Sequence, residues 1–110
     1  MFGSKEQKLE KMVAKKNASG IINLIGGKDI ALSLKAIEAL GRVPGDESYN
    51  ELISLIRSPR ADIRAAAFSA LGNLGDPKAR AHISHMVAAE KDPVVVEAMK
   101  KAMGKLHGND

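Results

Sequence analysis

Cysteine and tryptophan are absent from this sequence, and Phe2, Tyr49 and Phe68 are its only aromatic residues apart from histidine. Without cysteine, neither disulfide bonds nor thiolate metal sites can form. A chain that is 45% apolar but only 3% aromatic builds its core from Ala, Leu, Ile, Val and Met. Such a core favours closely packed helices over an aromatic-rich β-sandwich.

Long apolar runs are also missing. No run approaches the roughly 20 residues that span a bilayer, and the polar N-terminus lacks the apolar segment of a signal peptide. We therefore expect a cytoplasmic protein that does not contact a membrane. With 110 residues, the chain is expected to form one small domain.

The residues that are present form a repeat. The stretch Ala-Leu-Gly-Asn-Leu-Gly-Asp at residues 70–76 has a copy with one inserted residue at 39–46 and a degraded copy at 102–108. A shift of 31 residues also carries the aliphatic pattern of residues 21–25 onto residues 52–56. The pattern indicates two alternating kinds of helix: type A carries the Ala-Leu-Gly motif, and type B carries paired aliphatic residues.

This alternation predicts about seven helices in the order A-B-A-B-A-B-A, within a single repeat domain over residues 1–110. The predicted helix pairs cover residues 5–26, 29–57 and 59–91, and an unpaired terminal helix covers 93–107. Residue types that start or stop helices lie near these boundaries. The predicted starts are Ser4, Asn17, Asp29, Asp46, Ser58-Pro59, Asp76-Pro77 and Asp92-Pro93, and the predicted stops are Gly26-Gly27, Pro44-Gly45 and Gly108.

Three glycines, Gly41, Gly72 and Gly104, fall at the same repeat position. A glycine inside a helix costs about 1 kcal/mol relative to alanine. Their recurrence therefore indicates that this position serves close helix packing or helix termination.

Residues 59–93 match most of a known repeat unit. They contain Asp-Ile-Arg at 62–64, an alanine run at 65–67, the motif followed by proline at 70–77, and Asp-Pro at 92–93. This unit resembles the HEAT repeats, particularly the short variety named after phycobilisome lyases. The resemblance extends from about residue 5 to residue 108. It is looser in the outer copies, where Leu32-Ser33 replaces the usual Val-Arg pair and Val96 stands where an arginine is expected.

The resemblance implies a right-handed α-solenoid of stacked antiparallel helix pairs, in which the second helix of each pair lines the concave face. Members of the family mostly bind other proteins. Some relatives are enzymes, namely chromophore lyases, an iron-dependent hydroxylase of a modified lysine and DNA glycosylases, so the fold alone does not decide the function. The iron-binding relatives use repeated His-Glu pairs, and this sequence has no His-Glu dipeptide.

Outward positions of the type B helices are the predicted contact residues for another protein. They are Asn23, Tyr49, Glu51, Ser54, His82 and His85. His82 and His85 are three residues apart and share a helix face, and Glu51 precedes His82 by one repeat. A metal site formed by Glu51, His82 and His85 is a weak alternative to a solvent-facing polar strip, so no metal and no cofactor is predicted.

The basic residues suggest nucleic acid only weakly, because the net charge is +4. The edge formed by the turns after the type B helices mixes both signs, and phosphate binding needs a cluster of one sign and favours aromatic platforms. That edge carries Lys28, Arg57, Arg60, Arg64 and Lys91 together with Asp29, Asp62, Glu90 and Asp92. Lysines are denser in the terminal helices, at Lys5, Lys8, Lys11, Lys15, Lys16, Lys100, Lys101 and Lys105.

The seventh helix lacks a type B partner, yet it carries Val94, Val96, Met99 and Met103. Packing against the fifth and sixth helices is the favoured interpretation of these side chains. The alternative is an exposed apolar strip that binds a partner helix or a second copy of the chain. We accordingly expect a monomer or a weak homodimer.

No nucleophile–base arrangement is evident, and no catalytic residue is predicted. The sequence predicts a non-catalytic scaffold or adaptor that binds another protein through its concave face. Two alternatives stay open: an accessory subunit of a lyase-type or other enzyme complex, and weak nucleic-acid binding through the lysine-rich terminal helices.

Overall fold

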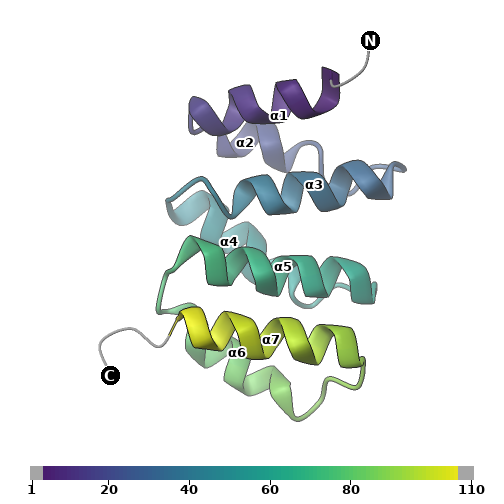
Figure 1. The fold of residues 1–110 in the computed structure, drawn as a ribbon, viewed down its shortest axis with the longest axis vertical. Coiled ribbons are helices and arrows are strands. Elements are labelled where there is room, and N and C mark those ends of the chain that lie inside the picture. Colours follow the sequence, from purple (N-terminus) through teal and green to yellow (C-terminus); the bar gives the residue numbers. More distant parts are fainter. Residues whose placement is uncertain (1–3, 107–110) are drawn as a thin grey trace.

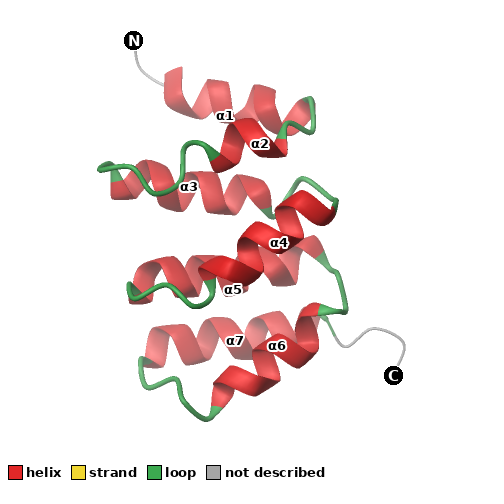
Figure 2. Cartoon of the chain, turned by 180° about the vertical axis from the view of Figure 1, so that it is seen from behind, coloured by secondary structure: helices red, strands yellow, loops and turns green. Residues whose placement is uncertain are grey.

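The computed structural model describes residues 4–106, and over this range it contains helices and turns without a strand. The helices form two layers: the type A helices lie side by side in one layer, and the type B helices lie behind them (Figures 1 and 2). This arrangement confirms the predicted all-α solenoid. The type A helices are α1 (Ser4–Ala14), α3 (Ile30–Leu40), α5 (Ala61–Leu74) and α7 (Pro93–Lys105), and the type B helices are α2 (Ala18–Ile22), α4 (Asp46–Leu55) and α6 (Ala79–Val87).

Small residues let the type A helices stack closely. A Cβ atom added to Gly41 would lie 2.9 Å from the Cα atom and the carbonyl oxygen of Ala70. One added to Gly72 would lie 3.0 Å from the Cα atom of Ala102. Both distances are shorter than ordinary van der Waals contact: a side chain at Gly41 would force the backbone of α5 to shift, and one at Gly72 would make a tight contact with α7.

The core fills the space between the two layers. Each type B helix packs mainly against the type A helix that follows it, α2 on α3, α4 on α5 and α6 on α7. The largest side chain with no exposed surface is Phe68 of α5. Leu52 of α4, Ile56 directly after α4 and Ile83 of α6 are likewise fully buried.

Three predicted helix starts are confirmed. The side-chain carbonyl or carboxylate oxygens of Asn17, Asp29 and Asp92 accept hydrogen bonds from backbone N–H groups two or three residues later, at 2.9–3.0 Å. Pro93 follows Asp92 as the first helical residue, where its missing N–H has no consequence. These caps satisfy backbone donors that the first turn of a helix leaves without a partner.

For three other helices, the residue that precedes the first helical residue differs from the predicted one by one or two positions. Asp46 is the first residue of α4, after Gly45, whose φ is +130°. The Ser58 hydroxyl accepts a hydrogen bond from the N–H of Arg60, and α5 begins only at Ala61. Asp76 closes a similar turn before α6 begins at Ala79. The reason is that Ser and Asp side chains also close short turns of their own, which here precede the helix.

The predicted helix ends are also too late in the first two repeats. α2 ends at Ile22, and the chain then makes successive turns up to Gly26, whose φ is +92°. α3 ends at Leu40, before Pro44-Gly45, because the residues from Gly41 onward turn toward α4. α1 includes Ser4 as its first helical residue. The predicted end of the last helix at 107 and its stop at Gly108 lie outside the described residues.

Within residues 4–106, no helix combines the length and the apolar character needed to cross a bilayer.

Candidate functional site

A polar row follows the type B layer. Asn23, Ser54 and His85 are separated by the repeat shift of 31 residues, and all three are exposed. Asn23 directly follows α2, Ser54 lies in the last turn of α4, and His85 lies in the last turn of α6. We call Asn23, Ser54 and His85 the type B row. It is the part of the predicted contact set that the structure places at the surface in one register.

Tyr49 does not belong to this surface, because its side chain is only 8% exposed. Burial raises the pKa of its hydroxyl, and the nearby carboxylate of Asp76 adds to this effect. The ammonium nitrogen of Lys78 lies 4.8 Å from the centre of the ring, within range of a cation–π interaction. Tyr49 therefore packs in the core beside Leu52, and the prediction that it faces outward is corrected.

The weak metal candidate is not assembled. Glu51 and His82 are half-buried, whereas His85 is exposed. Among residues 4–106, no group of three or more His, Asp or Glu side chains is positioned to hold a metal ion. Glu51, His82 and His85 therefore do not form a ligand set in this structure.

A hollow of about 670 Å³ lies beside His85. We call it the His85 hollow. Within residues 4–106, neither the guanidinium group of Arg57 nor the ammonium group of Lys91 forms a hydrogen bond or an ion pair. Its lining consists of Arg57, Arg64, His85, Met86, Ala89, Glu90, Lys91 and Asp92.

One wall of this hollow is held by the ion pair between Arg64 and Glu90. The Nε and Nη2 atoms of Arg64 donate hydrogen bonds of 2.9 and 3.0 Å to the two carboxylate oxygens of Glu90. Nη1 donates to the backbone carbonyls of Ser58 and Pro59. The side chains of Arg64 and Glu90 are only 19% and 6% exposed. This pair therefore ties the turn before α5 to the turn before α7.

The hydrogen bonds from Arg64 hold the pKa of Glu90 below its ordinary value of 4.5. A carboxylate whose pKa is lower in the folded state stabilises the fold above its unfolded-state pKa, and that contribution is lost as the pH falls through the folded-state pKa. We expect the difference in unfolding free energy between the native protein and Glu90→Gln to shrink below about pH 4.5. Urea unfolding of both proteins, followed by circular dichroism from about pH 7 to about pH 3, measures this difference in unfolding free energy.

A matched control for this titration is Asp62→Asn. Asp62 pairs with Arg60, but their side chains are 42% and 53% exposed. Solvent screens such a pair, so the pH-dependent difference is expected to be smaller than for Glu90→Gln. A difference for Glu90→Gln that stays constant with pH would contradict the assigned role of the ion pair.

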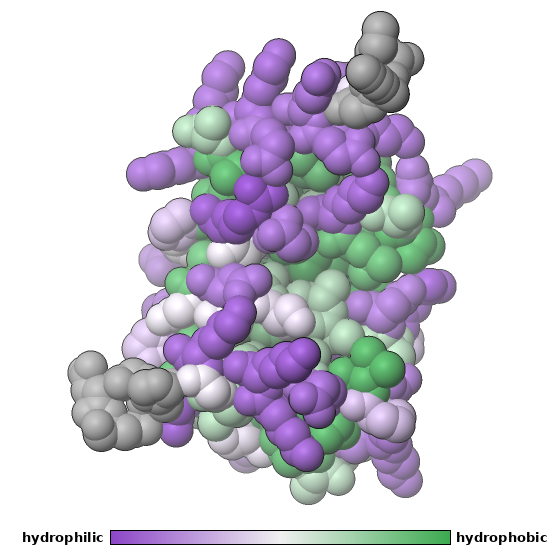
Figure 3. Space-filling view, in the orientation of Figure 1, coloured by the Kyte–Doolittle hydropathy of each residue, from purple (hydrophilic) through white to green (hydrophobic). Residues whose placement is uncertain are grey.

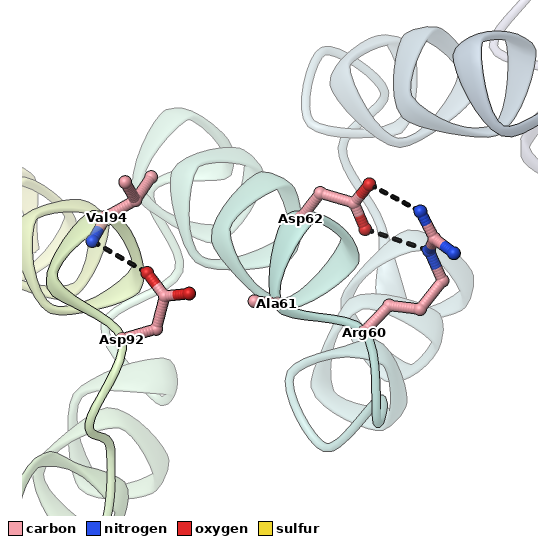
Figure 4. Close-up of a pocket in the computed structure, with 5 residues that line it drawn as sticks. All are labelled: Arg60, Ala61, Asp62, Asp92 and Val94. Carbon is pink, nitrogen blue, oxygen red and sulfur yellow. Dashed lines mark hydrogen bonds and ion pairs between the residues drawn. The ribbon is translucent and has the colours of Figure 1, made fainter.

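A second hollow, of about 520 Å³, lies between the starts of α5 and α7 (Figure 4). Its two carboxylates are engaged within their own turns: Asp62 pairs with Arg60, and Asp92 accepts the N–H of Val94. The figure shows the Asp62–Arg60 pair turned away from Asp92. The two acids are thus used for local structure, and their arrangement does not provide a general acid and a general base facing one substrate position.

The lysine-rich N-terminal helix is partly neutralised. The ammonium group of Lys5 lies 2.9 Å from the carboxylate of Asp29, and Glu6 and Glu10 of α1 pair with Lys35 and Arg42. Figure 3 shows the resulting hydrophilic cover over α1 and α3. Both aromatic rings in the described part of the chain, Tyr49 and Phe68, are buried and cannot stack with bases. Phe2 lies outside the described residues.

The predicted apolar strip on α7 is divided between core and surface. Met99 is only 1% exposed and belongs to the core, whereas Val94 is 70% exposed. Val96 and Met103 are half-buried. A further apolar residue, Val87 at the end of α6, is 49% exposed, although the paired aliphatic pattern of the type B helices favours a core position for it.

A family model for HEAT repeats matches residues 18–104. No curated protein and no solved structure matches the chain.

Proposed function

The chain belongs to the HEAT-repeat family, and from this premise we propose that it is a non-catalytic scaffold that binds a segment of another protein on the face formed by its type B helices. HEAT repeats commonly mediate protein binding, but the fold does not select a partner. The proposed contact surface is therefore argued from the side chains that this chain places on α2, α4 and α6.

The observation that carries the proposal is the type B row together with the hollow at its end. Asn23 and Ser54 offer neutral hydrogen-bonding groups along the row, and His85 borders the His85 hollow. The side chains of Arg57 and Lys91 add two cations that have no hydrogen-bond or ion-pair partner in the described part of the chain. A polar segment that carries a carboxylate at one end fits this sequence of groups, because the carboxylate can pair with Arg57 while the remainder follows the row.

The rival functions have less support. Nucleic acid would need aromatic platforms or a basic cluster, and the cations near the His85 hollow are interleaved with Glu90 and Asp92. An accessory subunit of an enzyme complex would bind its partner through the same type B surface as a general adaptor, so the surface does not distinguish these two roles. The identity of the bound protein separates an accessory subunit of a lyase-type or other enzyme from a general adaptor.

Site-specific photocrosslinking tests the proposal. A benzophenone amino acid at position 54 is expected to crosslink to a protein in an extract of the native host, because Ser54 is exposed in the middle of the type B row. The matched control is position 69, since Ser69 is also an exposed serine in a helix but lies in α5, in a different layer. Denaturing electrophoresis and mass spectrometry measure the crosslinked product.

The charge reversal Arg57→Glu should weaken the crosslink from position 54 by about tenfold at low ionic strength, because it places a negative charge where a partner carboxylate is expected. Equal crosslinking from positions 54 and 69 would refute the proposed surface. Crosslinks that are removed by nuclease treatment would favour nucleic acid instead.

A further inference from the structure

The outer face of α7 exposes positions that are covered in the earlier repeats. Gly41 packs against Ala70, and Gly72 packs against Ala102, but a Cβ atom at Gly104 would meet nothing within 4 Å. Gly104 is also exposed, whereas Gly41 and Gly72 are buried. The same glycine that receives the next type A helix elsewhere is therefore open on α7.

Neighbouring positions follow the same rule. Leu40 and Leu71 are fully buried, whereas Met103, at the equivalent position of α7, is half-buried. Lys100 is exposed at the position that Phe68 occupies in the core of the preceding repeat. In α3 and α5 these side chains are enclosed by the helices of the following repeat, so the open face of α7 has the shape of a helix-binding surface.

An apolar hollow of about 240 Å³ marks this face. It lies between the end of α6 and the outer side of α7. Val87 is 49% exposed there, although Ile56, its equivalent one repeat earlier, is fully buried. The lining consists of Val87, Val96, Met99, Lys100 and Met103, and we call it the α7 hollow.

The exposed charges of α7 are mainly positive, and one of them, Lys100, lines the α7 hollow. Lys100 and Lys101 are exposed and have no described partner. Lys105 donates a hydrogen bond of 2.6 Å to the side-chain oxygen of Asn73, which is an uncharged partner. Glu97 is the one acidic residue of α7. A helix that occupies the hollow would therefore gain from acidic residues beside its apolar stripe.

A second copy of the chain does not fit this surface. The opposite end of the solenoid is α1, where Lys8 and Lys11 are exposed and have no described partner. Leu9 of α1 is buried, and Met12 and Val13 pack against the core. A head-to-tail contact would place lysines of α1 against lysines of α7, and a contact between two α7 faces would also oppose like charges.

We propose that the outer face of α7 docks an amphipathic helix of another protein, with its apolar stripe in the α7 hollow and acidic residues against Lys100 and Lys101. The docked helix takes the place that a following helix takes on α3 and α5. Methionine at position 103 suits such a contact because its side chain adapts to the apolar surface that it meets. This surface is separate from the type B row and does not depend on the function proposed for that row.

The test uses two synthetic peptides of about 18 residues, long enough for several helical turns. Both carry leucines at i, i+3, i+4 and i+7, and one has glutamate beside this stripe where the other has lysine. With the full chain at low ionic strength, we expect the glutamate peptide to bind at least about tenfold more tightly by fluorescence anisotropy. Binding of the glutamate peptide should shift the methyl NMR signals of Val87, Val96 and Met103 in the protein, while the His85 ring signals stay in place.

Two variants complete the experiment. Lys100→Glu combined with Lys101→Glu should reverse the preference so that the lysine peptide binds more tightly, and both side chains are exposed, so the fold is retained. Met103→Glu should weaken the binding of the glutamate peptide by at least about tenfold, because it places a carboxylate in the apolar hollow. Equal affinities for the two peptides, or an unchanged preference in the double variant, would overturn the proposal. A dimer in light scattering that Met103→Glu dissolves would overturn it in favour of self-association.

Discussion

Phe68→Ala is expected to lower the unfolding free energy by about 3–5 kcal/mol, a large share of the total stability of a small domain. Phe68 is the largest fully buried side chain, and it lies in α5 at the centre of the array. Its removal leaves a cavity that the stacked helices on either side cannot fill without moving. The melting temperature should fall by roughly 15–25 °C in scanning calorimetry.

The matched control for Phe68→Ala is Lys100→Ala. Lys100 occupies the same repeat position in α7 but is exposed. Its replacement should change the unfolding free energy by less than about 0.5 kcal/mol, as is usual for surface positions. Similar losses at the two positions would mean that the enclosure of a type A helix by its following repeat does not determine the stability of this chain.

Gly41→Ala is expected to destabilise the protein by about 1–3 kcal/mol, whereas Gly104→Ala is expected to stabilise it by about 0.5–1 kcal/mol. At Gly41 the new Cβ would lie 2.9 Å from backbone atoms of Ala70, so α3 and α5 would have to separate. At Gly104 nothing lies within 4 Å, and the substitution only restricts the unfolded chain and favours helix. Urea unfolding of the two variants gives both values.

The opposite signs are the informative part of this comparison, because the substitution and the repeat position are the same. Gly72→Ala is expected to lie between these two values, since its Cβ would lie 3.0 Å from the Cα atom of Ala102, a tight contact that a small shift of α7 relieves. A loss of stability at Gly104 similar to that at Gly41 would contradict the open face of α7. It would also remove the structural basis for a docked helix there.

The sequence predicts the architecture well because the repeat period is a strong signal. The recurring glycines at 41, 72 and 104 and the paired aliphatic residues of the type B helices identify which helices are equivalent. Caps such as Asp29 and Asp92 then place some starts to the residue. Ser58 and Asp76 mislead because the side-chain chemistry that caps a helix also closes a tight turn.

The surface is predicted less well than the fold. Tyr49 could have been assigned to the core, because it lies three and seven residues before Leu52 and Ile56, on the same face of α4. The exposure of Val87 is not visible in the pattern of α6 alone, because the equivalent residue Ile56 is buried by helices of the following repeat. The Arg64–Glu90 pair joins residues that are 26 positions apart, and no spacing rule within one helix indicates it.

The α6 helix stands between the two proposed binding surfaces, with His85 beside one hollow and Val87 beside the other, two residues apart. α6 packs mainly on α7 and contacts α4 little. A ligand on one surface therefore acts on the same short helix that borders the second surface. If a ligand at one surface shifts α6, it changes the affinity of the other surface for its own ligand, and the second ligand then changes the affinity for the first by the same factor.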